Sequence, residues 1–366
     1  MGKKTIWGLV ILVVVILIIL IGRGNNSSGS PKIGVVAPLT GWGAYWGEGY
    51  VKGMQLAQDE IKAGGDNLDI AIEDGATDAQ KSATAAQKLI NIDKVNALAV
   101  EFTAPSSSVN PLSLSNKIPF VYDALVKKFV EDNPYAFKFY FDVGKQCAVA
   151  TEYLASQGYK NIGGLFLNLD FAPECEQAMT KVAQEKGIKI DITKFNIDTT
   201  DFRTIISKMK SSGIDALVPV FYEDHAISFF KQKADLGLRI PIFMGIGIPD
   251  GFTEKVRSSV PQSAIEGVMT FDQPISDDFR AKLARKYPGI VEKDFVPAAY
   301  GYDEVMYLYN GLSKCSKTDP DCVVSKMKQD AHVGVLQSAG FGDDRVLDMS
   351  PVYYRYTSGK LVEFNP

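Results

Sequence analysis

Most of the chain alternates short apolar runs with longer stretches in which apolar residues recur every three or four positions. Short apolar runs are typical of buried strands, and the longer spacing is typical of helices packed on one face. From Lys32 onward the two patterns take turns, which indicates a parallel sheet covered by helices. We expect strands at 32–37, 68–73, 97–100 and 119–122 and helices at 48–63, 77–91 and 106–116, with Thr77 as the N-cap of the second helix.

The same alternation starts again after a joint near 139–144. Helices are expected at 147–157, 173–186, 202–211 and 224–236, and strands at 161–167, 188–195, 216–221 and 242–244. Three later helices, at 277–286, 303–313 and 323–330, lack the strands for a third sheet, so we expect them to return to the first half. The end of the chain then returns to the second half.

The predicted fold class is therefore α/β, with two doubly wound parallel-sheet lobes and a ligand cleft between them. Three crossings of the chain would form the hinge. We expect lobe 1 to comprise residues 31–142 plus 274–341, and lobe 2 to comprise residues 143–273 plus 342–366.

The first 30 residues follow a different pattern. Lys3 and Lys4 precede an unbroken apolar block from Ile6 to Ile21, which would rise about 24 Å as a helix. The basic residues before the block predict a cytoplasmic N-terminus and export of the rest. Both an uncleaved membrane anchor over residues 6–22 and a cleaved signal peptide stay open, because no clear small-residue cleavage site follows. Residues 1–30 are thus a signal or anchor helix with a tether, and the remainder is expected in the periplasm or at the cell surface.

Composition narrows the class of protein. The chain has 366 residues, of which 46% are hydrophobic and 22% charged, and this excludes a disordered chain, a collagen-like repeat and a multi-span membrane protein. The formal charge of the whole chain is −4. Lys3, Lys4 and Arg23 all lie in the first 30 residues, which contain no acidic residue, so the part after residue 30 has a charge of −7. This balance gives no support for nucleic-acid binding.

Four cysteines in an exported chain suggest two disulfides. Cys315 and Cys322 flank a short polar stretch that can fold back on itself, and Cys147 and Cys175 would then pair by elimination, with free thiols as the alternative for the second pair. A metal site would need closely spaced histidine and cysteine ligands. The only histidines, His225 and His332, are far apart in the sequence, so we expect no metal.

No catalytic motif stands out. Neither histidine belongs to a recognisable nucleophile turn, and Ser106–Ser108 lack the glycines of a nucleophile elbow. Gly163 and Gly164 lie inside an expected strand and not after one, so no phosphate-binding loop is predicted. We therefore expect a binding protein without a cofactor, and not an enzyme.

Several motifs carry a family resemblance. The segment Ile-Gly-Val-Val-Ala-Pro-Leu-Thr-Gly at 33–41 and the helix with Gly47, Gly53 and Glu60 are similar to the start of the substrate-binding proteins of ABC importers, in the leucine/isoleucine/valine-binding branch. The stretch Asp-Phe-Arg-Thr at 201–204 and the turn Tyr-Gly-Tyr-Asp at 300–303 also resemble this family. The resemblance covers nearly all of residues 32–366 and implies the type I periplasmic-binding fold.

The resemblance implies an extracytoplasmic protein that captures a small polar or carboxylate-bearing ligand by lobe closure. The ligand would be an amino acid, an amide or an aromatic or aliphatic acid. The protein, expected as a monomer, would then deliver it to an ABC permease and its ATPase. The alternative is a membrane-tethered ligand-sensing ectodomain that acts through a partner protein. Only about five residues precede the apolar block, which leaves no room for an intracellular effector domain and favours transport.

The same resemblance implies a set of ligand-binding residues beyond the carboxyl ends of the strands, where open α/β sheets bind ligands. Trp46 would form an aromatic wall, although it could also be a core residue. Thr103 or the pair Ser106 and Ser107 would hold a carboxylate, with plain N-capping as the other interpretation of Ser106. Asp123 and Ala124 would bind the polar end of the ligand, although Asp123 could instead cap a helix or turn. Phe171 and Tyr222 would contribute aromatic rings, with core packing as the alternative for both. Tyr300 completes the set.

One departure from the family matters for the ligand. Amino-acid-binding members place an acidic residue where this chain has Gly247, to pair with the ammonium group of the ligand. A buried ammonium without a counter-charge is costly. Either another acid takes this place, or the ligand is not an α-amino acid, and we favour the second interpretation with a carboxylate or amide ligand. The candidate acids are Asp123, Glu223, Asp170 and Asp250.

Overall fold

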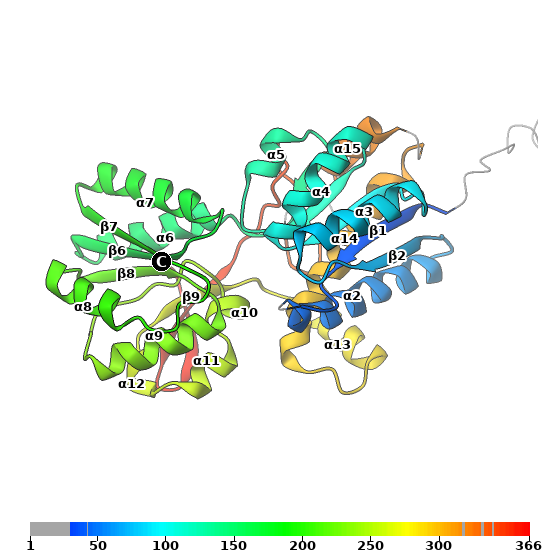
Figure 1. The fold of residues 1–366 in the computed structure, drawn as a ribbon. Helices are drawn as coiled ribbons and strands as arrows, with labels where there is room; N and C mark the ends of the chain where they lie inside the picture. The colour runs from blue at the N-terminus through cyan, green and yellow to red at the C-terminus, as the bar shows by residue number, and fades with distance from the viewer. Residues whose placement is uncertain (1–29, 42, 317–318, 331–332, 339) are drawn as a thin grey trace, which may run out of the picture.

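The computed structural model describes residues 30–41, 43–316, 319–330, 333–338 and 340–366, and these form two α/β bodies (Figure 1). Residues 1–29, which include the predicted anchor at 6–22 and nearly all of the predicted tether, lie outside the described residues. Within the described part of the chain, no helix combines the length and the apolar character that a membrane span requires.

The first body is built on a five-stranded parallel sheet in the order β2-β1-β3-β4-β5. Its central strands are buried along their whole length, as expected for a sheet covered on both faces. The strands are β1 (Lys32–Ala37), β2 (Asp69–Asp74), β3 (Ala97–Glu101), β4 (Phe120–Asp123) and β5 (Ala136–Lys138). The helices are α2 (Ala44–Ala63), α3 (Ala79–Asn91), α4 (Thr103–Asn116), α5 (Lys128–Asp132), α13 (Asp277–Lys286), α14 (Phe295–Ser313) and α15 (Pro320–Lys328), with a 3₁₀ turn at Glu292–Asp294.

The second body combines a parallel sheet in the order β7-β6-β8 with an antiparallel sheet in the order β11-β10-β9. Bridges from Leu217 to Ile242 and from Phe243 to Met269 connect the two sheets. The strands are β6 (Asn161–Leu167), β7 (Lys189–Phe195), β8 (Ala216–Val220), β9 (Met269–Asp272), β10 (Val352–Thr357) and β11 (Lys360–Phe364). The helices are α6 (Val143–Ser156), α7 (Ala172–Lys186), α8 (Arg203–Ser212), α9 (Glu223–Asp235), α10 (Ile248–Gly251), α11 (Glu254–Ser259) and α12 (Gln262–Ile265).

The α/β fold class predicted from the sequence is confirmed. Several details of the prediction are wrong, among them these three. The expected strand at 242–244 contributes only isolated bridges. The N-cap of α3 is Asp78, whose carboxylate accepts the N–H of Lys81 at 2.8 Å, while the Thr77 hydroxyl oxygen accepts the N–H of Gly43. Finally, α14 begins eight residues before the predicted start at 303, because its first turns are also apolar and buried.

Three passages of the chain connect the bodies. They lie between β5 and α6, between β9 and α13, and between residue 341 and β10. The first and third lie side by side, because Lys138 forms a parallel bridge with Val346. A connection of this kind is typical of a hinge. The exact lobe boundaries expected from the sequence stay a prediction.

Both predicted disulfides are present. Cys147 and Cys175 join α6 to α7 with their Cα atoms 5.4 Å apart, and Cys315 and Cys322 join the end of α14 to α15 with a Cα separation of 5.9 Å. The alternative of free thiols at Cys147 and Cys175 is therefore wrong.

Helices α2 and α14 pack closely, and glycines make this possible. A Cβ atom on Gly53 would lie 1.8 Å from the carbonyl oxygen of Ala298, and one on Gly301 would lie 2.2 Å from that of Tyr50. Real Cβ atoms do not come this close to backbone atoms, so larger residues at either position would push the helices apart. This packing fixes the position of Trp46 and Tyr300, which belong to the two helices.

Candidate ligand-binding site

The carboxyl ends of β3 and β4 meet at one edge of the first sheet. Glu101 and Asp123 are the last residues of these strands and stand opposite each other in the parallel register. The N–H of Phe102 donates to the backbone carbonyl of Asp123 at 2.7 Å, and the backbone then enters α4 at Thr103. Both carboxyl side chains are thereby held at the place where open α/β sheets bind ligands.

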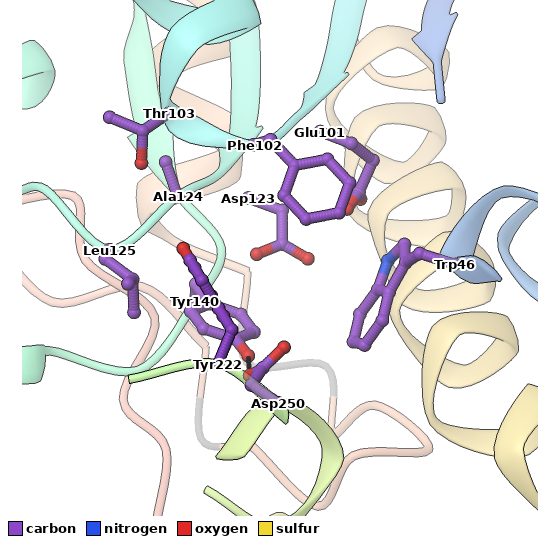
Figure 2. Close-up of a pocket in the computed structure, with 10 residues that line it drawn as sticks. All are labelled: Trp46, Glu101, Phe102, Thr103, Asp123, Ala124, Leu125, Tyr140, Tyr222 and Asp250. Carbon is purple, nitrogen blue, oxygen red and sulfur yellow. Dashed lines mark hydrogen bonds between the residues drawn. The ribbon is translucent and has the colours of Figure 1, made fainter. Parts of the chain in front are cut away.

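A cavity lies at this edge, and residues from both bodies line it (Figure 2). Most of the lining residues belong to the first body, Tyr140 belongs to the first crossing of the chain, and Tyr222 and Asp250 come from the second body. The ten lining residues are Trp46, Glu101, Phe102, Thr103, Asp123, Ala124, Leu125, Tyr140, Tyr222 and Asp250. The cavity is therefore a cleft between the bodies, a place where small ligands commonly bind.

Aromatic rings form much of the wall. The ring centroid of Trp46 lies 6.5 Å from that of Phe102 and 5.8 Å from that of Tyr300. The ring centroids of Tyr140 and Tyr300 are 5.3 Å apart. These contacts hold the rings in place, so the aromatic surface is present before a ligand arrives.

Asp250 faces the cavity from the second body. It belongs to the single turn of α10, which begins directly after Gly247, and its carboxylate accepts a hydrogen bond from the hydroxyl of Tyr140 (Figure 2). Burial raises the pKa of Asp250 to about 6, against the lowering effect of the Tyr140 hydrogen bond. A carboxyl of this kind changes its charge near neutral pH, which is common at functional sites.

A group of three buried carboxyls begins at the cavity wall: Glu101 and Asp123 line the cavity, and Glu304 lies beside them. The carboxylate oxygens of Glu101, Asp123 and Glu304 lie within 4.8 Å of one another, and all three residues are buried. The hydroxyl of Tyr50 donates to Glu304. Burial raises the pKa of each of the three carboxyls well above its ordinary value. The charge of Asp123 adds to the shifts of Glu101 and Glu304, and that of Asp250 adds to the shift of Asp123.

The buried lysine whose charge acts on Asp123 is hydrogen-bonded elsewhere. The Lys138 side chain is entirely buried, and its Nζ donates to the carbonyl oxygens of Ala124, Tyr140 and Phe141 at 2.7, 3.0 and 2.8 Å. Burial lowers the pKa of Lys138 to about 8. Three carbonyls use all three donors of an ammonium group, so Lys138 fixes the crossing and forms no ion pair with the carboxyls.

The structure brings five of the predicted ligand-binding residues together in this cavity. They are Trp46, Thr103, Asp123, Ala124 and Tyr222. Gly247 and Tyr300 line an adjoining hollow that shares Tyr140 with the first cavity. A ligand-binding role for each of these residues stays a prediction.

Three other predicted residues lie away from both hollows. Ser106 is buried within the first turns of α4, where its hydroxyl donates to the carbonyl of Val100 at 3.4 Å, and Ser107 is exposed. The N-cap of α4 is Phe102, so the capping role considered for Ser106 is wrong. Phe171 is buried at the N-cap of α7. Ligand binding by these residues stays a prediction that this arrangement does not favour.

The structure also sorts the four acids that could replace the missing one at Gly247. Asp123 and Asp250 line the cavity. Glu223 accepts from the hydroxyl of Thr253 and pairs with Lys255 at 2.6 Å, and Asp170 is exposed. Asp250 lies three residues after Gly247, so one turn of helix returns an acid to the cleft.

Sequence reasoning missed four lining residues: Glu101, Phe102, Leu125 and Tyr140. The first three are neighbours in sequence of predicted residues and follow the same strands, so their place after a strand was a usable signal. Tyr140 lies in a crossing of the chain, and its position depends on the arrangement of the two bodies.

Comparison with known proteins agrees with this architecture. The model of the periplasmic binding protein family matches residues 30–348, so the chain belongs to this family. A Leu/Ile/Val-binding protein homolog from Brucella abortus is 26% identical over 325 residues, which is 85% of this chain and 85% of the relative. Membership places the chain among extracytoplasmic proteins that bind small solutes, a class of binding proteins and not of enzymes.

Solved structures show the same fold. A leucine-binding protein from Thermotoga maritima is 19% identical with a TM-score of 0.78, and the alignment covers 92% of this chain and 98% of that one. A solute-binding protein of an ABC transporter from Rhodopseudomonas palustris, solved with p-hydroxybenzoic acid, is 22% identical with a TM-score of 0.80 and coverages of 92% and 96%. The predicted type I periplasmic-binding fold is confirmed.

Proposed function

We propose that this protein captures a small organic solute between its two bodies and delivers it to an ABC importer in the membrane. One observation carries the proposal: the cavity is lined from the first body, from a crossing of the chain and from the second body. A solute that contacts all three parts favours the closed arrangement over the open one, and this difference in affinity drives closure. The two similar solved structures named above are a leucine-binding protein and a transporter component, which supports this direction.

Capture can be tested without knowing the solute. Native mass spectrometry of freshly purified protein, compared with the same sample after denaturation, should reveal a small molecule that leaves the chain on unfolding. The variant Trp46→Ala removes a wall of the cavity and should retain less of it, while a variant at the exposed Ser107, Ser107→Ala, should retain as much as the wild type. Capture would be contradicted if no small molecule copurifies with the protein and no added small molecule binds to it.

Delivery requires a second experiment. The liganded protein should stimulate ATP hydrolysis by an ABC permease and ATPase complex from the same organism, after that complex is reconstituted in lipid vesicles. The ligand-free protein should stimulate less, because only the closed arrangement presents both bodies together to the permease. Equal stimulation with and without ligand, or none, would contradict delivery to an importer.

A further inference from the structure

The charge of the cavity is one-sided. Its lining includes three carboxyl side chains, of Glu101, Asp123 and Asp250, and among the described lining residues there is no lysine, arginine or histidine. Lys138, the buried cation nearby, uses its donors on three backbone carbonyls. Within the described part of the chain, the acids of the cavity therefore have no salt-bridge partner.

One of these acids has an oxygen left over for a ligand. Asp123 is 5% exposed, and its Oδ2 accepts no hydrogen bond from an N–H or hydroxyl group of the described residues. Figure 2 shows its carboxylate pointing into the middle of the cavity, between Trp46 and Tyr140. A buried acceptor without a donor is costly, so this oxygen marks a place where a donor from a ligand would be stabilised.

Asp250 supplies a second acceptor from the opposite body. Its carboxylate faces the cavity while one oxygen is held by the hydroxyl of Tyr140. An ammonium group carries three donors and can therefore bond to both carboxylates at once. The aromatic rings of Trp46, Tyr140 and Tyr222 surround the same space, and the faces of such rings attract cations.

We propose that the solute is a small organic amine with a net positive charge and an apolar or aromatic body, and that its ammonium group lies between Asp123 and Asp250. The proposal deepens the proposed function and rests on it. It also differs from the carboxylate-bearing or amide ligand favoured by the sequence, because the acid missing at Gly247 is present at Asp250.

Other charge types fit this cavity less well. A benzoate-like anion would place its carboxylate beside Asp250, which has a pKa of about 6 and is ionised at pH 7.5, and like charges repel strongly in a site of low polarity. A neutral amide would leave the ionised Asp250 without a counter-charge. A zwitterionic amino acid could direct its carboxylate at the N-terminus of α4 but would bring no net positive charge. A bound divalent cation is the inorganic alternative, because the oxygens of Glu101, Asp123 and Glu304 converge.

The charge class can be tested with probes that share one ring. The full-length protein is first stripped of solute. Calorimetric titration at pH 7.5 then compares the binding of four probes: benzylamine, benzamide, benzoate and phenylalanine. Calcium chloride is titrated as a separate probe. We expect benzylamine to bind most tightly. If benzoate, benzamide or phenylalanine binds more tightly than benzylamine, the cationic assignment is overturned and solute capture still stands. Binding of calcium alone would have the same meaning.

The remaining outcome is that no probe binds. If native mass spectrometry nevertheless shows a copurified solute, only the cationic assignment fails. If no copurified solute is found either, both proposals fail.

Two variants locate the ammonium group. Asp123→Asn and Asp250→Asn keep the shape of each side chain and remove its charge, and each should weaken benzylamine binding by between about 10- and 100-fold, the range for a hydrogen bond to a charged group. Glu223→Gln is the matched control, because it removes an acid of α9 that does not line the cavity. Benzamide binding should change little in all three. Losses no larger than that of the control would overturn the placement.

Discussion

Single carboxyl groups decide the chemistry of the cleft. Asp250 is buried, accepts a hydrogen bond from Tyr140 and has a pKa raised to about 6. The groups around it are the hydroxyls of Tyr140, Tyr222 and Tyr300 and the carboxyls of Asp123 and Asp272. The hydroxyls have raised pKa values and stay neutral near pH 7, while burial raises the pKa of Asp272 to about 7.

These pKa values predict how binding of a cationic probe depends on pH. Asp250 is increasingly protonated as the pH falls through about 6, and only its ionised form attracts an ammonium group. Lowering the pH from 7.5 to 5 should therefore weaken benzylamine binding about tenfold through Asp250, and more if Asp123 takes up a proton as well. The probe itself stays charged throughout, because amine pKa values lie near about 10.

Calorimetric titration at several pH values checks this prediction, and Asp250→Asn should reduce the slope. Titration in buffers with different ionisation enthalpies should also show that benzylamine binding releases a proton near and below pH 6, where the free Asp250 carboxyl is largely protonated. Binding that strengthens as the pH falls would contradict an interaction between the ammonium group and an ionised Asp250.

Lys138 illustrates a buried charge with a structural role. Its ammonium group connects the loop after β4 to the first crossing through three carbonyl oxygens. The variant Lys138→Met would leave these carbonyls without a donor and should lower the free energy of unfolding by about 3 kcal/mol. Urea unfolding gives the value, and Lys145→Met at an exposed position of α6 is the control. A loss equal to that of the control would show that the three hydrogen bonds contribute nothing.

At the scale of elements, the contact of α2 with α14 is the most constrained in the first body. A methyl group at Gly53 would collide with the carbonyl of Ala298. We expect Gly53→Ala to destabilise the protein by about 3 kcal/mol or more, because the two helices would have to separate. Trp46 and Tyr300 would separate with them, and solute affinity should fall.

Thermal unfolding measures this effect. The control is Gly64→Ala at the end of α2, where the nearest atom to a new Cβ, the carbonyl oxygen of Ile61, is 3.3 Å away and φ is −72°. This change should stay within about 1 kcal/mol of the wild type. Similar losses at both glycines would mean that the close approach is not the cause.

The elements also show how far the sequence could predict the fold. Strands β1, β3 and β6 are buried apolar runs, and their pattern identified them. The β10–β11 hairpin is mostly half-buried or exposed and rich in tyrosine and charged residues, so it lacks the alternation that marks a strand. Strand β9 has four residues, too few for a period to emerge.

The same distinction applies to the site. Trp46, Asp123 and Tyr222 lie beside strand ends, a position that topology alone predicts. Tyr140 and Asp250 enter the cavity because a crossing and a one-turn helix are placed by contacts distant in sequence. Their pairing across 110 residues has no local signal.

At the scale of the whole molecule, the three connections predict a hinge motion. A bound solute should hold the two bodies closer together, because Asp123 and Asp250 approach the same group from opposite sides. Small-angle scattering should show a smaller radius of gyration with benzylamine than without it. Asp250→Asn should reduce the change at the same probe concentration, and an identical radius in all samples would contradict closure.

The two ends of the described chain belong to different bodies. Strand β1 opens the first body at Lys32, and β11 completes the second at Phe364 (Figure 1). A fluorescent donor fused ahead of residue 30 and an acceptor fused after Pro366 would each follow one body. Energy transfer between them would then report the concentration of the solute in living cells, so the order of strands along this chain already has the layout of a genetically encoded sensor.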